Sequence, residues 1–236
     1  MPVALITGAS RGLGREIAIA LAKSGYEVFI NYRSADREAA DLVRTIGADA
    51  RAIKADVGEP DQVRRMADLI HKESGRLDAV VNNAGITKDA LLIRQSEDAW
   101  DSIIRTNLKG CFNITRTMAP LMVKSGGGHI VNISSRSGLR GKVGQSAYGA
   151  SKAALLGLTY ASAAELAEHN IRVNAVLPGY MMTDMGAKAG KAIEEARRRS
   201  VLNKLSSESE VAAFIASIIK TEGITGQVFS LDSRIL

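Results

Sequence analysis

Short apolar runs rich in β-branched residues alternate with longer segments of helical periodicity along this chain of 236 residues. Such alternation predicts a parallel sheet whose strands are joined by crossover helices. Because the strands of a parallel sheet are buried on both sides, we expect helices to cover both faces. The seven expected strands are residues 3–7, 27–32, 51–55, 79–82, 129–134, 172–177 and 227–231.

The segments between these strands have the periodicity of helices, and capping signals mark several of their ends. Ser34, Ser96 and Ser207 are candidate N-caps, and Gly25 and Gly47 are candidate C-terminal stops. No linker or low-complexity tract interrupts the pattern, so residues 1–236 are expected to form one domain. The expected helices are residues 12–23, 34–46, 60–74, 96–107, 110–125, 146–168 and 207–220.

Composition narrows the class of protein. Hydrophobic residues make up 46% of the chain and charged residues 24%, as is ordinary for a globular protein. No apolar run approaches the length of a bilayer-spanning helix and no signal peptide is visible, so we expect a cytoplasmic protein that does not bind membranes. The lone cysteine, Cys111, lies in a mostly apolar stretch, which favours a small core residue over a reactive thiol.

Charge favours an anionic ligand or partner. The chain has 31 Lys plus Arg against 25 Asp plus Glu, a formal net charge of +6. The basic residues are scattered and only 4% of residues are aromatic, so nucleic acid is not an expected partner. The run Arg197, Arg198 and Arg199 is more typical of a solvated helix face than of a docking patch.

A glycine-rich segment, residues 7–14, lies between the first expected strand and the first expected helix. Gly8, Gly12 and Gly14 would let the backbone approach a pyrophosphate, and the free amides at the start of the helix would attract the anion. The spacing differs from G-x-G-x-x-G, and a purely structural turn is the alternative. The position between a strand and a helix favours dinucleotide binding.

The end of the second expected strand indicates which dinucleotide is bound. An acidic residue there would hold the ribose 2'-hydroxyl of NAD, but the strand ends in Tyr32 and Arg33. Arg33 and Arg11 could bind a 2'-phosphate through charge-assisted hydrogen bonds, which favours NADP. The alternative is that Asp36 reaches the ribose; its other expected role is to favour the start of a helix.

Tyr148 and Lys152 stand four residues apart in an expected helix, so they share one face of it. An ammonium beside a phenol favours the phenolate. We therefore expect Lys152 to lower the pKa of Tyr148 and to make it a usable proton donor near neutral pH.

These motifs, in this order, resemble the short-chain dehydrogenase/reductase family over essentially the whole chain. The resemblance implies a doubly wound Rossmann fold of class α/β with a seven-stranded parallel sheet in the order 3-2-1-4-5-6-7. It also implies a catalytic tetrad of Asn107, Ser135, Tyr148 and Lys152. The cofactor contacts that it implies are Gly8, Ser10, Arg11, Gly12, Leu13, Gly14, Arg33, Asp56, Val57, Asn83, Ala84, Gly85, Tyr148, Lys152, Pro178, Gly179 and Thr183, with no metal ligands.

The resemblance implies that hydride passes from the nicotinamide of NADP(H) to a carbonyl carbon. Ser135 and Tyr148 would bind the carbonyl oxygen, and Tyr148 would give up its proton. Lys152 would also hold the nicotinamide ribose, and Asn107 would keep a helix kinked around a water that relays protons. Ser134 competes with Ser135 for the catalytic place, but its hydroxyl is more typical of one that satisfies nearby backbone or cofactor groups.

Several segments resemble most closely the subgroup of 3-oxoacyl carrier-protein reductases of fatty acid synthesis. They are residues 106–110, 174–179 and 223–227. The resemblance implies a 3-oxoacyl thioester substrate on acyl carrier protein or CoA, and a homotetramer. Dehydrogenation of another alcohol, such as a sugar, a steroid or a cyclic alcohol, and a non-catalytic NADP sensor remain alternatives.

The chain departs from that subgroup at three places. His129 and His169 stand where carrier-protein reductases often have docking arginines; as docking residues, they would strengthen carrier binding as pH falls. As ordinary surface histidines, they would not. The end of the chain, residues 229–236, lacks the glycine pair that is common in the subgroup, which could alter the substrate mouth or the tetramer contact.

Residues 180–203 are expected to form a lid over the substrate. The lid contains Met181, Met182 and Met185. Their flexible side chains suit an apolar acyl chain, and they suit helix packing equally well.

Overall fold

The computed structural model describes residues 1–182 and 190–235 of the chain. At its centre is a parallel sheet of seven strands in the order β3-β2-β1-β4-β5-β6-β7, which confirms the expected fold class and strand order. Every strand end lies within one residue of its expected position. They are β1 (Val3–Ile6), β2 (Glu27–Tyr32), β3 (Ala50–Lys54), β4 (Ala79–Asn82), β5 (Gly128–Ile133), β6 (Ile171–Pro178) and β7 (Val228–Leu231).

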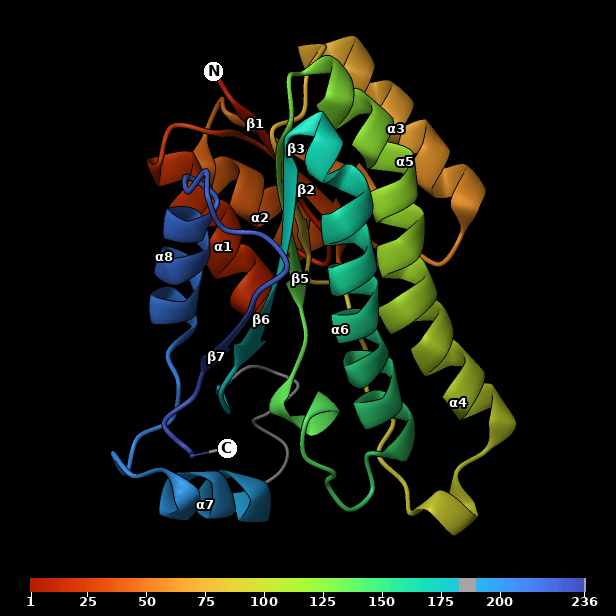
Figure 1. Ribbon diagram of the computed structural model, residues 1–236, viewed down its shortest axis with the longest axis vertical. Coiled ribbons are helices and arrows are strands. Elements are labelled where there is room, and N and C mark those ends of the chain that lie inside the picture. Colours follow the sequence, from red (N-terminus) through yellow and green to blue (C-terminus); the bar gives the residue numbers. More distant parts are fainter. Residues whose placement is uncertain (183–189, 236) are drawn as a thin grey trace.

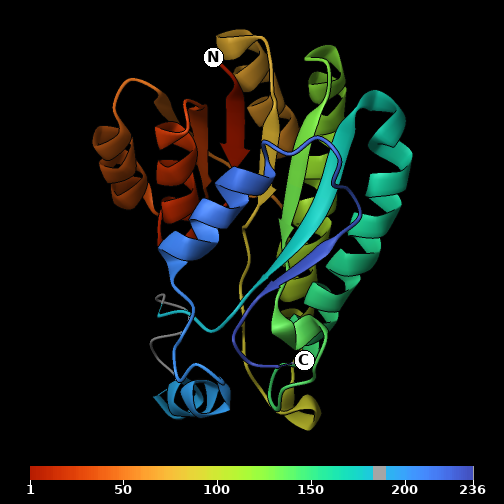
Figure 2. The ribbon, with the colours of Figure 1, turned by 60° about the vertical axis from the view of Figure 1, so that its left-hand side comes forward.

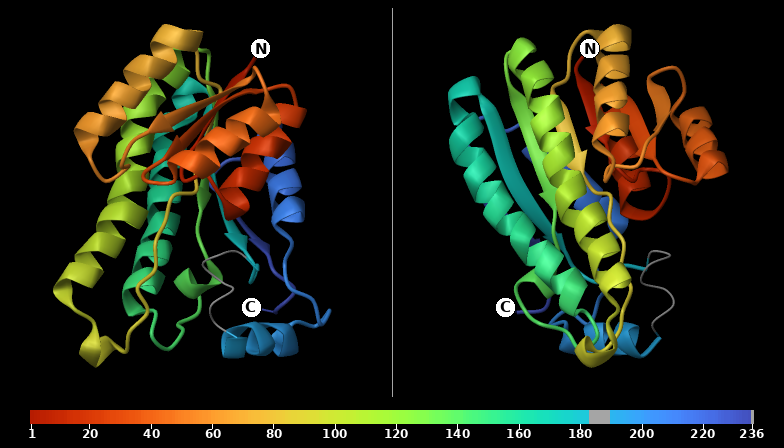
Figure 3. Two further views of the ribbon diagram at one scale, coloured as in Figure 1. Left: turned by 180° about the vertical axis from the view of Figure 1, so that it is seen from behind. Right: turned by 90° about the vertical axis from the view of Figure 1, so that its right-hand side faces the viewer.

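Helices cover both faces of this sheet (Figures 1 and 2). On one face lie α1, α2 and α8, and on the other lie α3, α5 and α6, with α4 leading into the start of α5 (Figure 3). A further helix, α7, lies apart from these layers, beyond the carboxyl ends of the strands. The bounds are α1 (Gly12–Lys23), α2 (Asp36–Ile46), α3 (Pro60–Ser74), α4 (Glu97–Ile104), α5 (Gly110–Lys124), α6 (Ser146–Leu166), α7 (Gly190–Arg199) and α8 (Glu208–Ile218).

Two large apolar cores, one on each face, hold these layers together, and a small third cluster contains Leu156, Ala175 and Leu177. Successive residues of a strand point to opposite faces, so β1 sends Ala4 and Ile6 into the core under α1 and α8. Val3 and Leu5 of the same strand enter the core under α3 and α5. A strand that must fill two cores has no polar face, which explains why the sequence shows continuous apolar runs.

Three helical segments differ from the sequence-based expectation. Ser34 was expected to cap α2, but the helix begins at Asp36 after Ala35, whose side chain makes no capping bond. The chain from α4 to α5 passes through a π-helical turn, Arg105–Lys109, instead of breaking between two helices. Helix α7 was not predicted. Ser96 and Ser207 do cap α4 and α8 by accepting hydrogen bonds from the amides of Ala99 and Glu210.

Within residues 1–182 and 190–235, no helix combines the length and the apolar character that crossing a bilayer requires.

Candidate active site

The residues that the sequence singles out follow the carboxyl ends of the strands, where the loops of a doubly wound sheet meet. The glycine segment follows β1, Arg33 follows β2 and Asp56 follows β3. Asn83 follows β4 and Ser135 follows β5. Strands β1 and β4 are neighbours, and Ile6 is in register with Val81, 75 positions further along the chain. The sheet order therefore brings motifs that are distant in sequence to one edge.

The glycine segment is folded tightly against the end of β4. Gly8 and Gly12 have φ angles of 62° and 53°, a backbone region that favours glycine. A Cβ atom on Gly14 would lie 2.5 Å from the side-chain nitrogen of Asn83 and 2.5 Å from the carbonyl oxygen of Gly8. A Cβ atom on Gly8 would lie 2.8 Å from the Cα atom of Ala84. The segment therefore needs these glycines, and it leads directly into the N-terminus of α1, where the amides attract an anion.

Two polar residues that were not predicted as site residues hold this segment in place. The Thr7 hydroxyl accepts hydrogen bonds from the amides of Asn83 and Ala84, each 3.0 Å long. Asn31, buried inside β2, accepts from the Gly8 amide at 3.4 Å and donates to the Ala55 carbonyl at 3.0 Å. The signal for Asn31 was present in the sequence, because a buried polar residue inside an apolar strand needs partners.

Asn83 completes the same network. Its side-chain amide donates to the carbonyl oxygens of Thr7 and Gly8 at 3.0 Å each.

Ser10 and Leu13, the other expected contacts of the glycine segment, are buried. Arg11 is the N-cap residue of α1, in an extended conformation with no side-chain capping bond.

Basic and acidic groups meet at the ends of β2 and β3. Arg33 is exposed, and its guanidinium lies 3.8 Å from Asp56, which also pairs with Arg105 at 3.3 Å. Asp36 starts α2 and accepts hydrogen bonds from Lys54 at 2.9 Å and from Tyr32 at 3.2 Å. The bond from Lys54 is the main reason why the pKa of Asp36 is lowered. The Asp36 carboxylate, in the first turn of α2, is thus already bound by Lys54 and Tyr32.

Asn107 lies inside the π-helical turn and is almost fully buried. Its side chain accepts from the Ile86 amide at 2.8 Å and donates to the Ile86 carbonyl at 3.0 Å. It also donates to the hydroxyl of Ser151, on α6, at 3.0 Å. A π-helical turn inside a longer helix is frequent at functional sites, and here it turns the Asn107 amide toward α6. The expectation that Asn107 marks a distorted helix agrees with this geometry.

Tyr148 and Lys152 lie on the first turns of α6. The ammonium of Lys152 is 5.7 Å from the centroid of the Tyr148 ring and donates to the Ile133 carbonyl at 2.7 Å. Burial lowers the pKa of Lys152 to about 8. Burial also raises the pKa of Tyr148 above its usual value, against the opposing effect of a hydrogen bond with Ser135. The expected lowering of the Tyr148 pKa is therefore wrong for this arrangement, because desolvation of the phenolate outweighs the hydrogen bond with Ser135, and Lys152 is not among the causes of the shift.

The two candidate serines have different neighbours. Ser134 is buried, and its hydroxyl donates to the carbonyl oxygen of Lys152 at 2.7 Å. This is the backbone-satisfying role expected for it. Ser135 caps a short 3-10 turn by accepting from the Ser137 amide at 3.2 Å, and its side chain reaches Tyr148. The structure thus brings Ser135, and not Ser134, to the tyrosine.

The remaining expected cofactor contacts lie around this group. A Cβ atom on Gly85 would be 3.4 Å from the Asn107 side-chain oxygen and 3.5 Å from the Lys152 nitrogen. Val57 is buried against Gly110. Pro178 ends β6, and the Gly179 amide donates to the Leu231 carbonyl at 3.0 Å. Thr183 lies outside the described residues.

The structure places the two candidate docking histidines differently from what the sequence led us to expect. His129 is fully buried inside β5, with its Nε2 atom 2.7 Å from the side-chain nitrogen of Asn174, and burial lowers its pKa to about 4. His129 is therefore neither a surface histidine nor a docking residue, because it has no contact with solvent. His169 is exposed and lies 3.8 Å from Glu168.

Cys111 and the described methionines have mainly structural environments. Cys111 is buried, its Sγ atom lies 3.2 Å from the side-chain oxygen of Asn132, and burial raises its pKa to about 12. This confirms Cys111 as a small core residue. Met181 packs against the core beneath α1 and α8, whereas Met182 is 54% exposed. Met185 lies outside the described residues.

Comparisons with known proteins agree with the fold. The family model described as short chain dehydrogenase matches residues 2–194. The chain is 42% identical over 236 residues to the "3-oxoacyl-[acyl-carrier-protein] reductase FabG" of Staphylococcus aureus, covering 97% of this chain and 96% of that protein. It is 40% identical over 243 residues to the protein of the same name from Thermotoga maritima, covering 99% and 97%. The chain belongs to the short-chain dehydrogenase family.

Proposed function

We propose that this protein is an NADPH-dependent reductase that converts 3-oxoacyl thioesters to 3-hydroxyacyl thioesters in fatty acid synthesis. The observation that carries the proposal is the grouping of Ser135, Tyr148 and Lys152 beside the glycine segment, at the carboxyl edge of the sheet. The names of relatives that are 40% to 42% identical over nearly the whole chain support the substrate.

The residues present fit a dinucleotide. The positions of Gly8 and Gly14 leave no room for a side chain, and the amides at the start of α1 are free of a side-chain cap, so an anion can approach the backbone there. Asn83 and Ala84 would line the opposite side, and Lys152 would hold the sugar nearest the reaction. When bound, the nicotinamide supplies the hydride that reduces the carbonyl carbon.

Arg33 supports NADP over NAD. Its exposed guanidinium stands at the end of β2, where a ribose 2'-substituent would lie, and guanidinium groups bind phosphate through paired hydrogen bonds. Asp36, the competing acid, is engaged by Lys54 and Tyr32. The charge of Arg33 is partly balanced by the Asp56 carboxylate. In the proposed complex, the guanidinium would therefore contact both this carboxylate and the 2'-phosphate of NADP.

In the proposed mechanism, Ser135 and Tyr148 donate hydrogen bonds to the carbonyl oxygen and stabilise the negative charge that develops there. The raised pKa of Tyr148 keeps its proton in place near neutral pH, so the phenol can transfer that proton to the oxygen. Lys152, whose pKa is lowered to about 8, can exchange a proton near neutral pH and so can return one toward the tyrosine. Asn107 connects α6, which carries Tyr148 and Lys152, to the backbone of Ile86: its side-chain amide donates to the Ser151 hydroxyl and to the Ile86 carbonyl.

The proposal extends to the whole chain. Residues 1–236 would act as one dinucleotide-binding and catalytic unit, with residues 180–203, which include α7, as the substrate lid. The protein would assemble as a homotetramer, because Ala153, Gly157 and Ala161 form an exposed line of small residues along α6. Small residues allow a second helix to approach closely, so this face suits contact with another copy.

An assay of cofactor oxidation tests the function. Purified protein would be given NADPH or NADH together with acetoacetyl carrier protein, acetoacetyl-CoA or unrelated ketones. We expect NADPH oxidation with the acetoacetyl thioesters and little with the other ketones. Turnover of a sugar, steroid or cyclic ketone alone would point to another dehydrogenase, and cofactor binding without any turnover would point to a sensor.

A further inference from the structure

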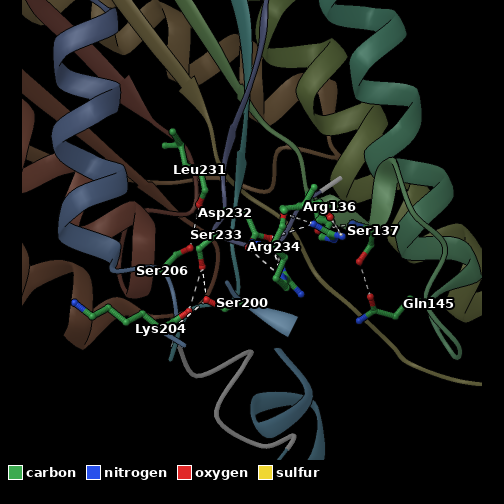
Figure 4. Close-up of polar contacts among 12 residues, drawn as sticks. Arg136, Ser137, Gln145, Ser200, Lys204, Ser206, Leu231, Asp232, Ser233 and Arg234 are labelled. Atoms are coloured by element: carbon green, nitrogen blue, oxygen red, sulfur yellow. Dashed lines mark hydrogen bonds and ion pairs between the residues drawn. The ribbon is translucent and has the colours of Figure 1, made fainter. Parts of the chain in front are cut away.

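The C-terminal tail, residues 231–235, makes polar contacts with three loops at the active-site edge of the sheet (Figure 4). It begins at the end of β7, where the Leu231 carbonyl accepts from the Gly179 amide and from the Ser206 hydroxyl, each at 3.0 Å. Further along, the Ser233 hydroxyl lies 2.6 Å from that of Ser200, which directly follows α7. The tail therefore joins the loop after β6 to the segment after α7.

The third loop is the one that contains Ser135. Its next residue, Arg136, donates from Nη1 to the Arg234 carbonyl at 2.8 Å and from Nη2 to the Ile235 carbonyl at 2.9 Å. Two parallel bonds from one planar guanidinium fix both the distance and the orientation of the group. Figure 4 shows Arg136 and Arg234 side by side where the tail ends.

A buried carboxylate reinforces this junction. The side chain of Asp232 is only 4% exposed, and it lies between Arg234, which binds both of its oxygens, and Arg136 at 4.0 Å. Asp232 also accepts from the Arg234 amide at 3.0 Å, which fixes the turn of the tail. A buried carboxylate that is paired in this way resists displacement, because removing one partner leaves the charge unpaired.

We infer that Arg136 is a positioning residue for Ser135: by binding the C-terminal tail, it holds the loop after β5 so that the Ser135 side chain faces Tyr148. The inference rests on the proposed function, in which Ser135 binds the substrate oxygen. Ser135 is attached to the rigid sheet on one side through Ile133 and Ser134, and to the short 3-10 turn Arg136–Gly138 on the other. Only the second attachment depends on the tail.

Steady-state kinetics of Arg136→Met test the inference. Loss of the guanidinium should lower kcat about 10- to 100-fold, the order expected for misplacement of a catalytic group by about 1 Å. The Kd of NADPH should stay unchanged, since no cofactor contact is assigned to this side chain. Arg140→Met, an exposed arginine of the same loop, is the matched control and should keep wild-type kcat. An unchanged kcat in Arg136→Met would overturn the inference.

A double-mutant cycle separates positioning from general loss of structure. If Arg136 acts through Ser135, Arg136→Met should lower kcat by less than about threefold in a Ser135→Ala background, because the group that it positions is already gone. Removal of residues 232–236 should have the same effects as Arg136→Met. Full additivity in the cycle would show that Arg136 acts elsewhere, and would overturn the inference.

A crystal structure of Arg136→Met gives a readout that does not depend on the substrate. The Ser135 side chain should turn away from Tyr148 in this variant, whereas it should keep facing Tyr148 in Arg140→Met. If Ser135 faces Tyr148 in both variants, the inference is wrong even if the proposed activity is right. If wild-type protein fails to reduce any 3-oxoacyl thioester, the proposed function is wrong, and the variant structure still decides the positioning role. Should Arg136→Met fail to fold, Arg136→Lys keeps the charge but not the two-pronged bond, and it should show the same displacement.

Discussion

At the scale of single residues, the choice of cofactor depends on which charged group is available at the end of β2. Asp36 is held by Lys54 and Tyr32, so it does not stand free to bind a ribose hydroxyl. The side chain of Arg33 is 54% exposed, and its guanidinium lies 3.8 Å from Asp56, which is a long distance for an ion pair. A phosphate group carries more negative charge than the Asp56 carboxylate, so it would compete well for the Arg33 guanidinium.

Arg33→Ala should therefore weaken NADPH binding about 10- to 100-fold, since hydrogen bonds to charged groups contribute about 1.5–3 kcal/mol each. NADH, which lacks the 2'-phosphate, should bind with nearly unchanged affinity. Titration of both cofactors, followed by their fluorescence, measures the two Kd values. Arg37→Ala, an exposed arginine on α2, is the control. An equal loss of affinity for both cofactors would contradict a phosphate-binding role.

The sequence predicted which candidate site residues lie close together more completely than it predicted their electrostatics. The spacing of Tyr148 and Lys152 follows from the helix alone, so a shared face could be anticipated. The contact of Lys152 with the Ile133 carbonyl and the half-burial of Tyr148 depend on how α6 packs on β5. Because that packing involves residues distant in sequence, the direction of the Tyr148 pKa shift could not be read from the spacing.

At the scale of single elements, β5 contains an unusual buried base. His129 has no solvent contact, and burial lowers its pKa to about 4 from the usual 6.5. The folded protein therefore keeps His129 neutral at pH values where the unfolded chain binds a proton. As a result, the contribution of neutral His129 to the free energy of unfolding is fully present above pH 6.5, and it is lost as the pH falls from 6.5 toward 4.

This shift of the His129 pKa corresponds to a decrease of about 3 kcal/mol in the free energy of unfolding between pH 6.5 and pH 4. Urea unfolding of wild-type protein and of His129→Gln between pH 7.5 and pH 4.5 should show a steeper loss of stability in the wild type. His169→Gln replaces an exposed histidine and should follow the wild-type curve. Parallel curves for wild type and His129→Gln would mean that His129 becomes protonated in the folded state.

Elements with an apolar stripe were predictable, and those without one were not. The strands and the helices that pack on them have residues in two continuous cores. In contrast, α7 places only Ala196 in a buried position among its residues 193–199, so no apolar period marks it as a helix. Ser34 looked like a cap by residue type, but the chain bends after β2 and the helix begins only at Asp36.

At the scale of the whole molecule, α6 presents an exposed face of small residues. Ala153, Gly157 and Ala161 are exposed, and a Cβ atom added to Gly157 would meet no atom of residues 1–182 or 190–235 within 4 Å. Alanine and glycine along one helix face permit close contact with a helix of another copy. The proposed homotetramer would bury this face.

Gly157→Leu should lower the assembly state, because the added side chain would hold the two helices apart. The substitution should not unfold the subunit, since leucine favours a helix over glycine by about 0.8 kcal/mol and there is space for it. Sedimentation velocity would measure the assembly state, and circular dichroism would verify the fold. Ala40→Leu, at an exposed position of α2, should remain tetrameric. A wild-type protein that sediments as a monomer would contradict the tetramer itself.

The strand order could be predicted because the motifs together resemble a family with one topology, and the structure confirms that order. The contacts of the tail could not be predicted. The bonds from Arg136 to Arg234 and Ile235 join residues that are 98 and 99 positions apart, and no periodicity links them. Contacts of this kind appear only when the loops at one edge of the sheet are brought together.

The central claim is that Tyr148 supplies the proton in an NADPH-dependent carbonyl reduction. The most direct measurement is single-turnover reduction of acetoacetyl carrier protein by Tyr148→Phe, with NADPH oxidation and cofactor affinity measured on the same sample. Loss of the hydroxyl should lower the rate by at least about 100-fold, in the range of general acid catalysis, while the Kd of NADPH stays near the wild-type value. Turnover at the wild-type rate in Tyr148→Phe would contradict the account.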